Sequence, residues 1–179
     1  ERIAAAAADL TGGPAAVSEW EIRREKRGKP YFKRHPELFL SITHSGEYWV
    51  CALSDMQVGI DLQMHTLREG ETENAAGLRY VNMAKRFFHE KEADYVQEKA
   101  PYQRFFRVWA AKESYVKYTG IGLVKGMDYY SVVKPDGTLT GEESVWQKQI
   151  AFQSECYMVV TAKQEAEIKL FSLTEQSKK

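Results

Sequence analysis

The chain has 179 residues, of which 44% are hydrophobic and 28% charged, and its 25 basic and 25 acidic side chains cancel. This length can bury a sizeable core, and zero net charge gives no support to a general nucleic-acid or anionic-membrane partner. No apolar run approaches the roughly 18 residues of a membrane span. The two cysteines lack a metal-like spacing, which suits a reducing compartment, so we expect a cytoplasmic protein with no nucleic-acid or membrane partner.

The first third of the chain predicts a helix followed by strands. Residues 1–11 contain five consecutive alanines and end before Gly12, which predicts a helix. A basic stretch beginning at Arg23 runs into Gly28-Lys29-Pro30, and it is either a solvated turn or a loop that meets a phosphorylated ligand. A turn of small polar residues is predicted at Thr43-His44-Ser45-Gly46. Strands are predicted at 20–23, 38–42, 48–53 and 58–63.

The strand at 58–63 carries candidate metal ligands. Side chains alternate along a strand, so Gly59, Asp61 and Gln63 would share one face, with the acid and the amide about 7 Å apart. The glycine admits close approach of another element. Oxygen donors in this arrangement suit Mg²⁺, although a lone strand aspartate can equally face solvent.

The rest of the chain predicts two helices and further strands. Residues 64–80 are polar and predict a linker or mobile crossover, followed by a helix at 83–97 and another after Ala100-Pro101. Residues 47–63 also align without a gap with residues 155–171. If this is a true repeat rather than generic β patterning, the chain consists of two related α+β halves. Further strands are predicted at 129–133, 145–152, 156–162 and 168–173.

One stripe of the second predicted helix joins apolar side chains and a carboxylate: Phe106, Trp109, Glu113 and Val116. Lys117 follows Glu113 by four residues, which could be an ordinary surface pair contributing about 0.2–0.5 kcal/mol. The aromatic neighbours and the glycine-containing loop that follows favour a metal or phosphate site instead. A buried carboxylate needs such compensation.

Five motifs in this order resemble the 4′-phosphopantetheinyl transferases of the surfactin-synthetase-activating type. They are Gly28-Lys29-Pro30, Thr43-His44-Ser45, Gly59-Ile60-Asp61, Arg86-Phe87-Phe88-x-x-x-Glu92 and Trp109-x-x-Lys112-Glu113-x-x-x-Lys117. The resemblance runs from about Gly28 to Ala162. It implies a holo-[acyl-carrier-protein] synthase, which transfers 4′-phosphopantetheine from coenzyme A to a serine of an apo acyl or peptidyl carrier protein. The alternative is a degenerate, non-catalytic homologue that binds coenzyme A or a carrier protein.

The fold implied by this resemblance is α+β, with two similar halves related by pseudo-two-fold symmetry. We expect an N-terminal half at 1–65, a C-terminal half at 66–179 and a ligand site between them in a monomer. The N-terminal half could be truncated at its start, because family members carry a longer segment before the Gly-Lys-Pro motif. That segment holds the 3′-phosphate in the family, so no 3′-phosphate site is assigned here.

The resemblance also implies the metal site. Asp61 and Glu113 would hold Mg²⁺ against the coenzyme A pyrophosphate, and Gln63 stands where the family usually has a second acid. Lys117 would bind the pyrophosphate and stabilise charge as the phosphoanhydride bond breaks. The general base for the carrier serine would be Glu113 or, as a second candidate, Glu92.

The remaining expected ligand contacts come from the first third of the chain. Gly28, Lys29 and Pro30 would lie near the adenine and ribose, mainly through their backbone. Thr43 and His44 would contact phosphate oxygens. Lys112 could bind ligand or carrier, but it cannot share the environment of Glu113 because neighbouring helical side chains point about 100° apart.

Overall fold

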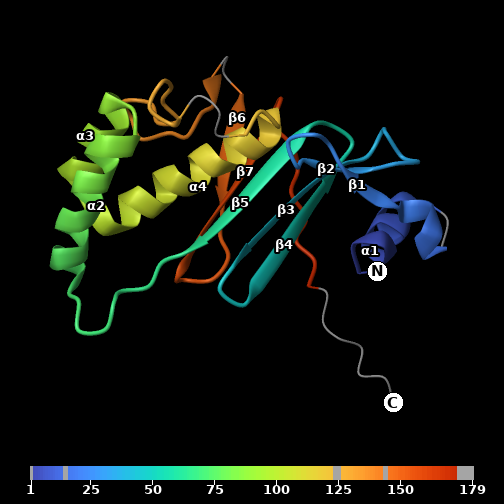
Figure 1. Ribbon diagram of the computed structural model, residues 1–179, viewed down its shortest axis with the longest axis horizontal. Coiled ribbons are helices and arrows are strands. Elements are labelled where there is room, and N and C mark those ends of the chain that lie inside the picture. Colours follow the sequence, from blue (N-terminus) through green and yellow to red (C-terminus); the bar gives the residue numbers. More distant parts are fainter. Residues whose placement is uncertain (1, 14–15, 123–125, 143–144, 173–179) are drawn as a thin grey trace.

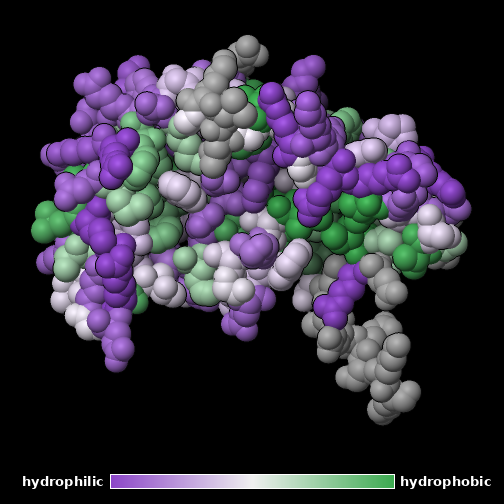
Figure 2. Space-filling model, in the orientation of Figure 1, coloured by the Kyte–Doolittle hydropathy of each residue, from purple (hydrophilic) through white to green (hydrophobic). Residues whose placement is uncertain are grey.

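The computed structural model describes residues 2–13, 16–122, 126–142 and 145–172. An N-terminal helix packs on a four-stranded antiparallel sheet with the strand order β1-β2-β3-β4 (Figure 1). Hydrophobic side chains gather over this sheet, while hydrophilic residues cover most of the same face of the molecule (Figure 2). The elements are α1 (Arg2–Thr11), the 3₁₀ helix η1 (Val17–Trp20), β1 (Ile22–Arg24), β2 (Pro30–Phe32), β3 (Phe39–Ser45) and β4 (Tyr48–Ser54).

The second group of elements is a three-stranded antiparallel sheet, ordered β5-β7-β6, with three helices. The long helix α4 runs along this sheet, and α2 and α3 pack at its far end (Figure 1). No helix in the described ranges is long and apolar enough to cross a membrane. The elements are β5 (Val58–Met64), α2 (Glu73–Phe87), α3 (Glu90–Glu98), α4 (Pro101–Thr119), β6 (Trp146–Ile150) and β7 (Cys156–Ala162).

Side-chain hydroxyls join the two sheets where β3 meets β5. The backbone amide of Leu62 donates to the Thr43 hydroxyl over 3.2 Å, and the amides of Ile60 and Met64 donate in the same way to Ser41 and Ser45. These three amides lie on the edge of β5 away from β7, where a strand would otherwise carry unpaired donors. The hydroxyls of alternate β3 residues therefore bond to the edge of β5 and join the two sheets.

Gly59 allows α4 to lie directly on β5, as the sequence predicts. A Cβ atom at this position would overlap the Ser114 carbonyl oxygen and the Tyr118 amide nitrogen, and it would lie 2.8 Å from Tyr118 Cα. Such distances are below any real contact, so only glycine permits this crossing. The crossing brings one face of α4 over the middle of β5.

The α+β class is confirmed, but several predicted elements are wrong. Residues 165–172 are irregular, which removes the strand predicted at 168–173, whose last residue lies outside the described ranges. At 129–133 there is only an isolated bridge between Val133 and Leu139. The proposed repeat therefore matches one strand in each pair, and pseudo-two-fold symmetry stays a prediction.

The second half of the region predicted as a linker is helical, because α2 begins at Glu73. The Thr72 hydroxyl caps α2 by accepting the Ala75 amide, and α2 then ends at Phe87, inside the predicted helix at 83–97. His89 begins α3 with a reciprocal capping box to Glu92. Because α2 ends at Phe87 and the His89 cap starts α3, the helix predicted at 83–97 is divided between two helices.

One further expectation changes with the observed strands, and the expected domain boundary stays a prediction. Residues 43–45, predicted as a turn, continue β3, and the chain reverses at residues 46–47. Strand β5 belongs to the C-terminal sheet. Sheet membership therefore divides the chain between β4 and β5, whereas the boundary expected at 65/66 follows β5.

Candidate functional site

Asp61 is the centre of a polar cluster between the sheets. Its side chain lies on β5 and is almost fully buried, with 2% of the residue exposed. One carboxylate oxygen accepts from the Thr43 hydroxyl over 3.0 Å and from Lys117 Nζ over 2.6 Å, while the other accepts from Gln63 Nε2 over 2.7 Å. These donors offset the cost of burying the charge. The structure therefore brings Lys117 to Asp61 and Gln63, from which it is distant in the sequence.

Glu113 lies one helical turn before Lys117 and approaches the same carboxylate. Burial raises the pKa of Glu113 above its ordinary value, the negative charge of Asp61 raises it further, and Lys117 partly offsets both effects. Lys117 forms its ion pair with Asp61, and the ion pairs of the described residues include none between Glu113 and Lys117. The surface-pair interpretation of the i, i+4 spacing is therefore wrong.

The donor chemistry around Asp61 fits a magnesium ion. Asp61 supplies one carboxylate, the Glu113 carboxylate is near enough for the charge of Asp61 to raise its pKa, and Gln63 can add its amide oxygen because its nitrogen already donates to Asp61. The described residues contain no cluster of three His, Cys, Asp or Glu side chains. Mg²⁺ prefers hard oxygen ligands and usually keeps several waters, so a site with two carboxylates is adequate.

The most deeply buried face of α4 differs from the predicted stripe. Phe105, Val108 and Lys112 are buried, whereas Phe106 and Trp109 are only partly buried. The stripe that contains Glu113 therefore borders the core instead of facing its centre. Glu113 itself is only partly buried.

The Gly-Lys-Pro loop lies at the C-terminal end of α4. Lys29 Nζ and Gln57 Nε2 both donate to the Tyr118 carbonyl oxygen, each over 2.5 Å. A cation here complements the negative end of the helix dipole. Burial lowers the pKa of Lys29, and Glu25 partly offsets this.

A cavity of about 300 Å³ opens beside this loop. It lies between the N-terminal sheet and the end of α4, with a largely apolar lining. Its walls include Lys29, Pro30, Tyr31, Phe39, Gln57 and Thr119. The predicted ligand loop therefore forms one wall of a cavity between the two groups of elements.

The structure separates Thr43 from His44. Because both residues belong to β3, their side chains point to opposite faces of the strand. Thr43 reaches Asp61, whereas His44 is exposed and stacks on Trp49 with 5.0 Å between ring centroids. The turn expected at 43–45 therefore does not form, whereas the contact of Thr43 and His44 with phosphate oxygens stays a prediction.

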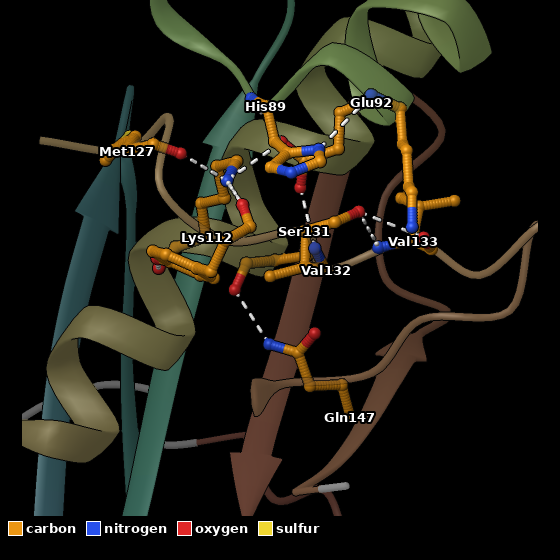
Figure 3. Close-up of polar contacts among 11 residues, drawn as sticks. His89, Glu92, Lys112, Met127, Ser131, Val132, Val133 and Gln147 are labelled. Carbon is orange, nitrogen blue, oxygen red and sulfur yellow. Dashed lines mark hydrogen bonds and ion pairs between the residues drawn. The ribbon is translucent and has the colours of Figure 1, made fainter. Parts of the chain in front are cut away.

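Glu92 and Lys112 contact each other (Figure 3), and among the described residues no hydrogen bond or ion pair joins either side chain to Asp61. Both side chains have 0% exposure, and they form an ion pair with 2.8 Å between Lys112 Nζ and Glu92 Oε2. The other carboxylate oxygen accepts the Val132 amide over 2.7 Å. A buried carboxylate with both oxygens occupied has no access to a carrier serine, so the structure does not support Glu92 as the general base. Lys112 is equally inaccessible to ligand or carrier.

Two contributors to the site were missed in the sequence. Gln57 gave no signal, because a single amide in a turn is common. The hydroxyls of Ser41 and Ser45 did give one, since together with Thr43 they alternate through the end of a strand. Assigning a turn to 43–46 obscured that alternation.

Comparison with known proteins gives matches within one family. A family model described as the 4′-phosphopantetheinyl transferase superfamily matches residues 57–171. The chain is 34% identical over 133 residues to a 4′-phosphopantetheinyl transferase of Bacillus subtilis, covering 72% of this chain and 53% of the relative. It is 30% identical over 131 residues to 4′-phosphopantetheinyl transferase Sfp of Bacillus subtilis strain 168, covering 70% and 53%.

A similarity to an animal protein extends this relationship. The L-aminoadipate-semialdehyde dehydrogenase-phosphopantetheinyl transferase of Rattus norvegicus is 32% identical over 112 residues, covering 57% of this chain and 35% of the relative. The chain spans about half the length of the two bacterial relatives. The family match covers β5, α4 and β7, the elements that carry Asp61, Glu113 and Lys117. The chain therefore belongs to the 4′-phosphopantetheinyl transferase superfamily.

Proposed function

We propose that the chain transfers 4′-phosphopantetheine from coenzyme A to a serine of an apo acyl or peptidyl carrier protein, with Mg²⁺ as cofactor. The observation that carries this proposal is the meeting of Asp61, Glu113 and Lys117 between β5 and α4. Two carboxylates and a cation are the groups that bind a metal and a pyrophosphate. Family membership supplies the reaction type.

Each residue of the cluster has its own role in the proposed reaction. Asp61 and Glu113 hold the metal, and Gln63 or a water completes its shell. When bound, Mg²⁺ supplies neutralisation of charge on the pyrophosphate oxygens. Lys117 binds the pyrophosphate beside Asp61. Glu113 also accepts the proton of the carrier serine, because its raised pKa makes it a stronger base than an ordinary glutamate.

Coenzyme A extends from this cluster toward the Gly-Lys-Pro loop. The cavity beside Lys29 and Pro30 takes the adenine and ribose, with Gly28 just before them in the chain, and Thr43, whose hydroxyl donates to Asp61, lies next to the phosphates. Because the His44 side chain lies on the exposed face of β3, it contacts a phosphate only on that face. The ligand then lies between an N-terminal half ending near residue 65 and a C-terminal half beginning at 66, in a monomeric cytoplasmic protein.

Mass spectrometry of carrier proteins tests the proposal. Incubation with coenzyme A, Mg²⁺ and a panel of apo carriers should add one phosphopantetheine to at least one carrier, and EDTA should prevent the addition. A variant carrier without its acceptor serine is the matched control. Retained coenzyme A binding with no mass gain on any carrier would instead support the non-catalytic alternative.

Replacing Gln63 with glutamate should lower the Mg²⁺ concentration required for half-maximal transfer. The substitution adds a third carboxylate beside Asp61 and removes the amide that now donates to it. A bound Mg²⁺ would reduce the repulsion between these carboxylates, so the affinity for Mg²⁺ should rise. A shift of about tenfold, measured by titrating Mg²⁺ at saturating coenzyme A, is the expected scale, since it corresponds to about 1.4 kcal/mol. An unchanged Mg²⁺ requirement would place Gln63 outside the metal shell.

A further inference from the structure

The buried ion pair between Glu92 and Lys112 is the centre of a network outside the proposed ligand site (Figure 3). Lys112 comes from the middle of α4, and Glu92 from the first turn of α3. The ammonium also donates to the carbonyl oxygens of Met127 over 2.5 Å and Tyr130 over 2.7 Å. The network therefore ties α4 to α3 and to the irregular segment that follows α4.

Every strong hydrogen-bonding group of the pair has a partner. An ammonium has three donors, and Lys112 uses them on Glu92, Met127 and Tyr130. Glu92 accepts from Lys112 and from two backbone amides, those of His89 and Val132. Because each of these donors and acceptors has a hydrogen-bond partner, both side chains are held in one direction. An apolar contact between flexible side chains does not fix their direction in this way.

Residues on both sides of Glu113 in the sequence are anchored in this way. The Ala111 carbonyl oxygen accepts from Gln147 Nε2 over 2.8 Å. The Ser114 hydroxyl lies 2.8 Å from the Thr161 hydroxyl, on β7. Together with Lys112, these contacts fix the rotation of α4 at residues 111–114. Lys117, farther along the same helix, is consequently held against Asp61, with 2.6 Å between its Nζ and the carboxylate oxygen, and Glu113 points about 100° away from Lys112.

We propose that Glu92 and Lys112 are positioning residues, which hold α4 at the rotation that presents Glu113 and Lys117 to Asp61. This inference rests on the proposed function, because it takes those two residues as the metal and pyrophosphate ligands. Neither Glu92 nor Lys112 touches substrate. Their effect on transfer acts through the helix.

Energetics separate positioning from simple stabilisation. A buried ion pair is often replaceable by neutral side chains without loss of stability, whereas removing one partner leaves a buried charge uncompensated. A Lys112→Met variant should therefore be unstable, and a Glu92→Gln/Lys112→Met double variant should recover much of the stability. The double variant lacks the ammonium that joins α4 to Glu92, Met127 and Tyr130, so α4 should not return to its wild-type rotation.

The experiment compares the two variants with Val96→Ala, which removes buried side-chain volume from α3 and leaves both members of the pair unchanged. Each protein is studied at a temperature where its unfolded fraction is below one in a hundred by circular dichroism. We expect Val96→Ala to transfer phosphopantetheine at the wild-type rate. Lys112→Met and the double variant should lose at least tenfold in kcat and need at least tenfold more Mg²⁺.

Hydrogen exchange of α4 tests the inference without any activity. Amides of residues 113–119 should exchange at least tenfold faster in the double variant than in Val96→Ala. Exchange and kcat that match Val96→Ala would overturn the positioning role and leave the proposed function intact. If wild type modifies no carrier, the proposed function fails, and equal exchange in the two variants would still overturn the positioning role.

Discussion

Replacing Gly59 with alanine is expected to lower the free energy of unfolding by about 3 kcal/mol, because overpacking against backbone cannot be relieved by a side-chain rotation. The added Cβ would overlap the Ser114 carbonyl and the Tyr118 amide, so α4 must move away from β5. That movement also separates Lys117 from Asp61, which are now 2.6 Å apart. Urea unfolding followed by circular dichroism measures the loss.

Gly77→Ala is the matched control. Gly77 lies within α2, and a Cβ there would be 3.6 Å from Pro101, an ordinary contact. Alanine should stabilise the helix by about 0.5–1 kcal/mol, since glycine is the poorer helix former. If Gly59→Ala were as stable as wild type, the close crossing of α4 and β5 would be incorrect.

Replacing Glu113 with glutamine is expected to reduce transfer at least about 100-fold, the scale seen when one preorganised electrostatic group is removed. The same change should raise the midpoint of thermal unfolding at neutral pH in EDTA. Burial and the charge of Asp61 disfavour the ionised form of Glu113, and a neutral amide avoids both penalties. Loss of activity with gained stability is the signature of a ligand site.

The sign of this stability difference depends on pH. The folded-state pKa of Glu113 is raised, so wild type loses stability as pH rises from the unfolded value of 4.5 through the folded value. The advantage of Glu113→Gln should therefore be present at neutral pH and vanish below about pH 4. Glu90→Gln, at an exposed position on α3, is the control and should change neither quantity. A Glu113→Gln variant less stable than wild type at neutral pH would contradict this account of its burial.

Motif order determined the family, and local patterning determined the α+β class. The aspartate of Gly59-Ile60-Asp61 and the Glu113–Lys117 spacing were recognisable because their chemistry is local to one strand and one helix. Glu92 belongs to an equally visible motif, yet its role was misassigned. A motif records that a carboxylate is present, and only packing shows whether that carboxylate faces ligand or a buried lysine.

By itself, the sequence determined which side chains form the candidate centre, because two carboxylates and a lysine in a recognisable motif order specify oxygen-ligand and pyrophosphate chemistry. The tertiary structure alone decided how they meet. It showed that Lys117 pairs with Asp61 instead of Glu113, that Thr43 and His44 face opposite sides of β3, and that Lys112 is buried. These outcomes depend on contacts between segments far apart in the chain, which helical and strand periodicities do not encode.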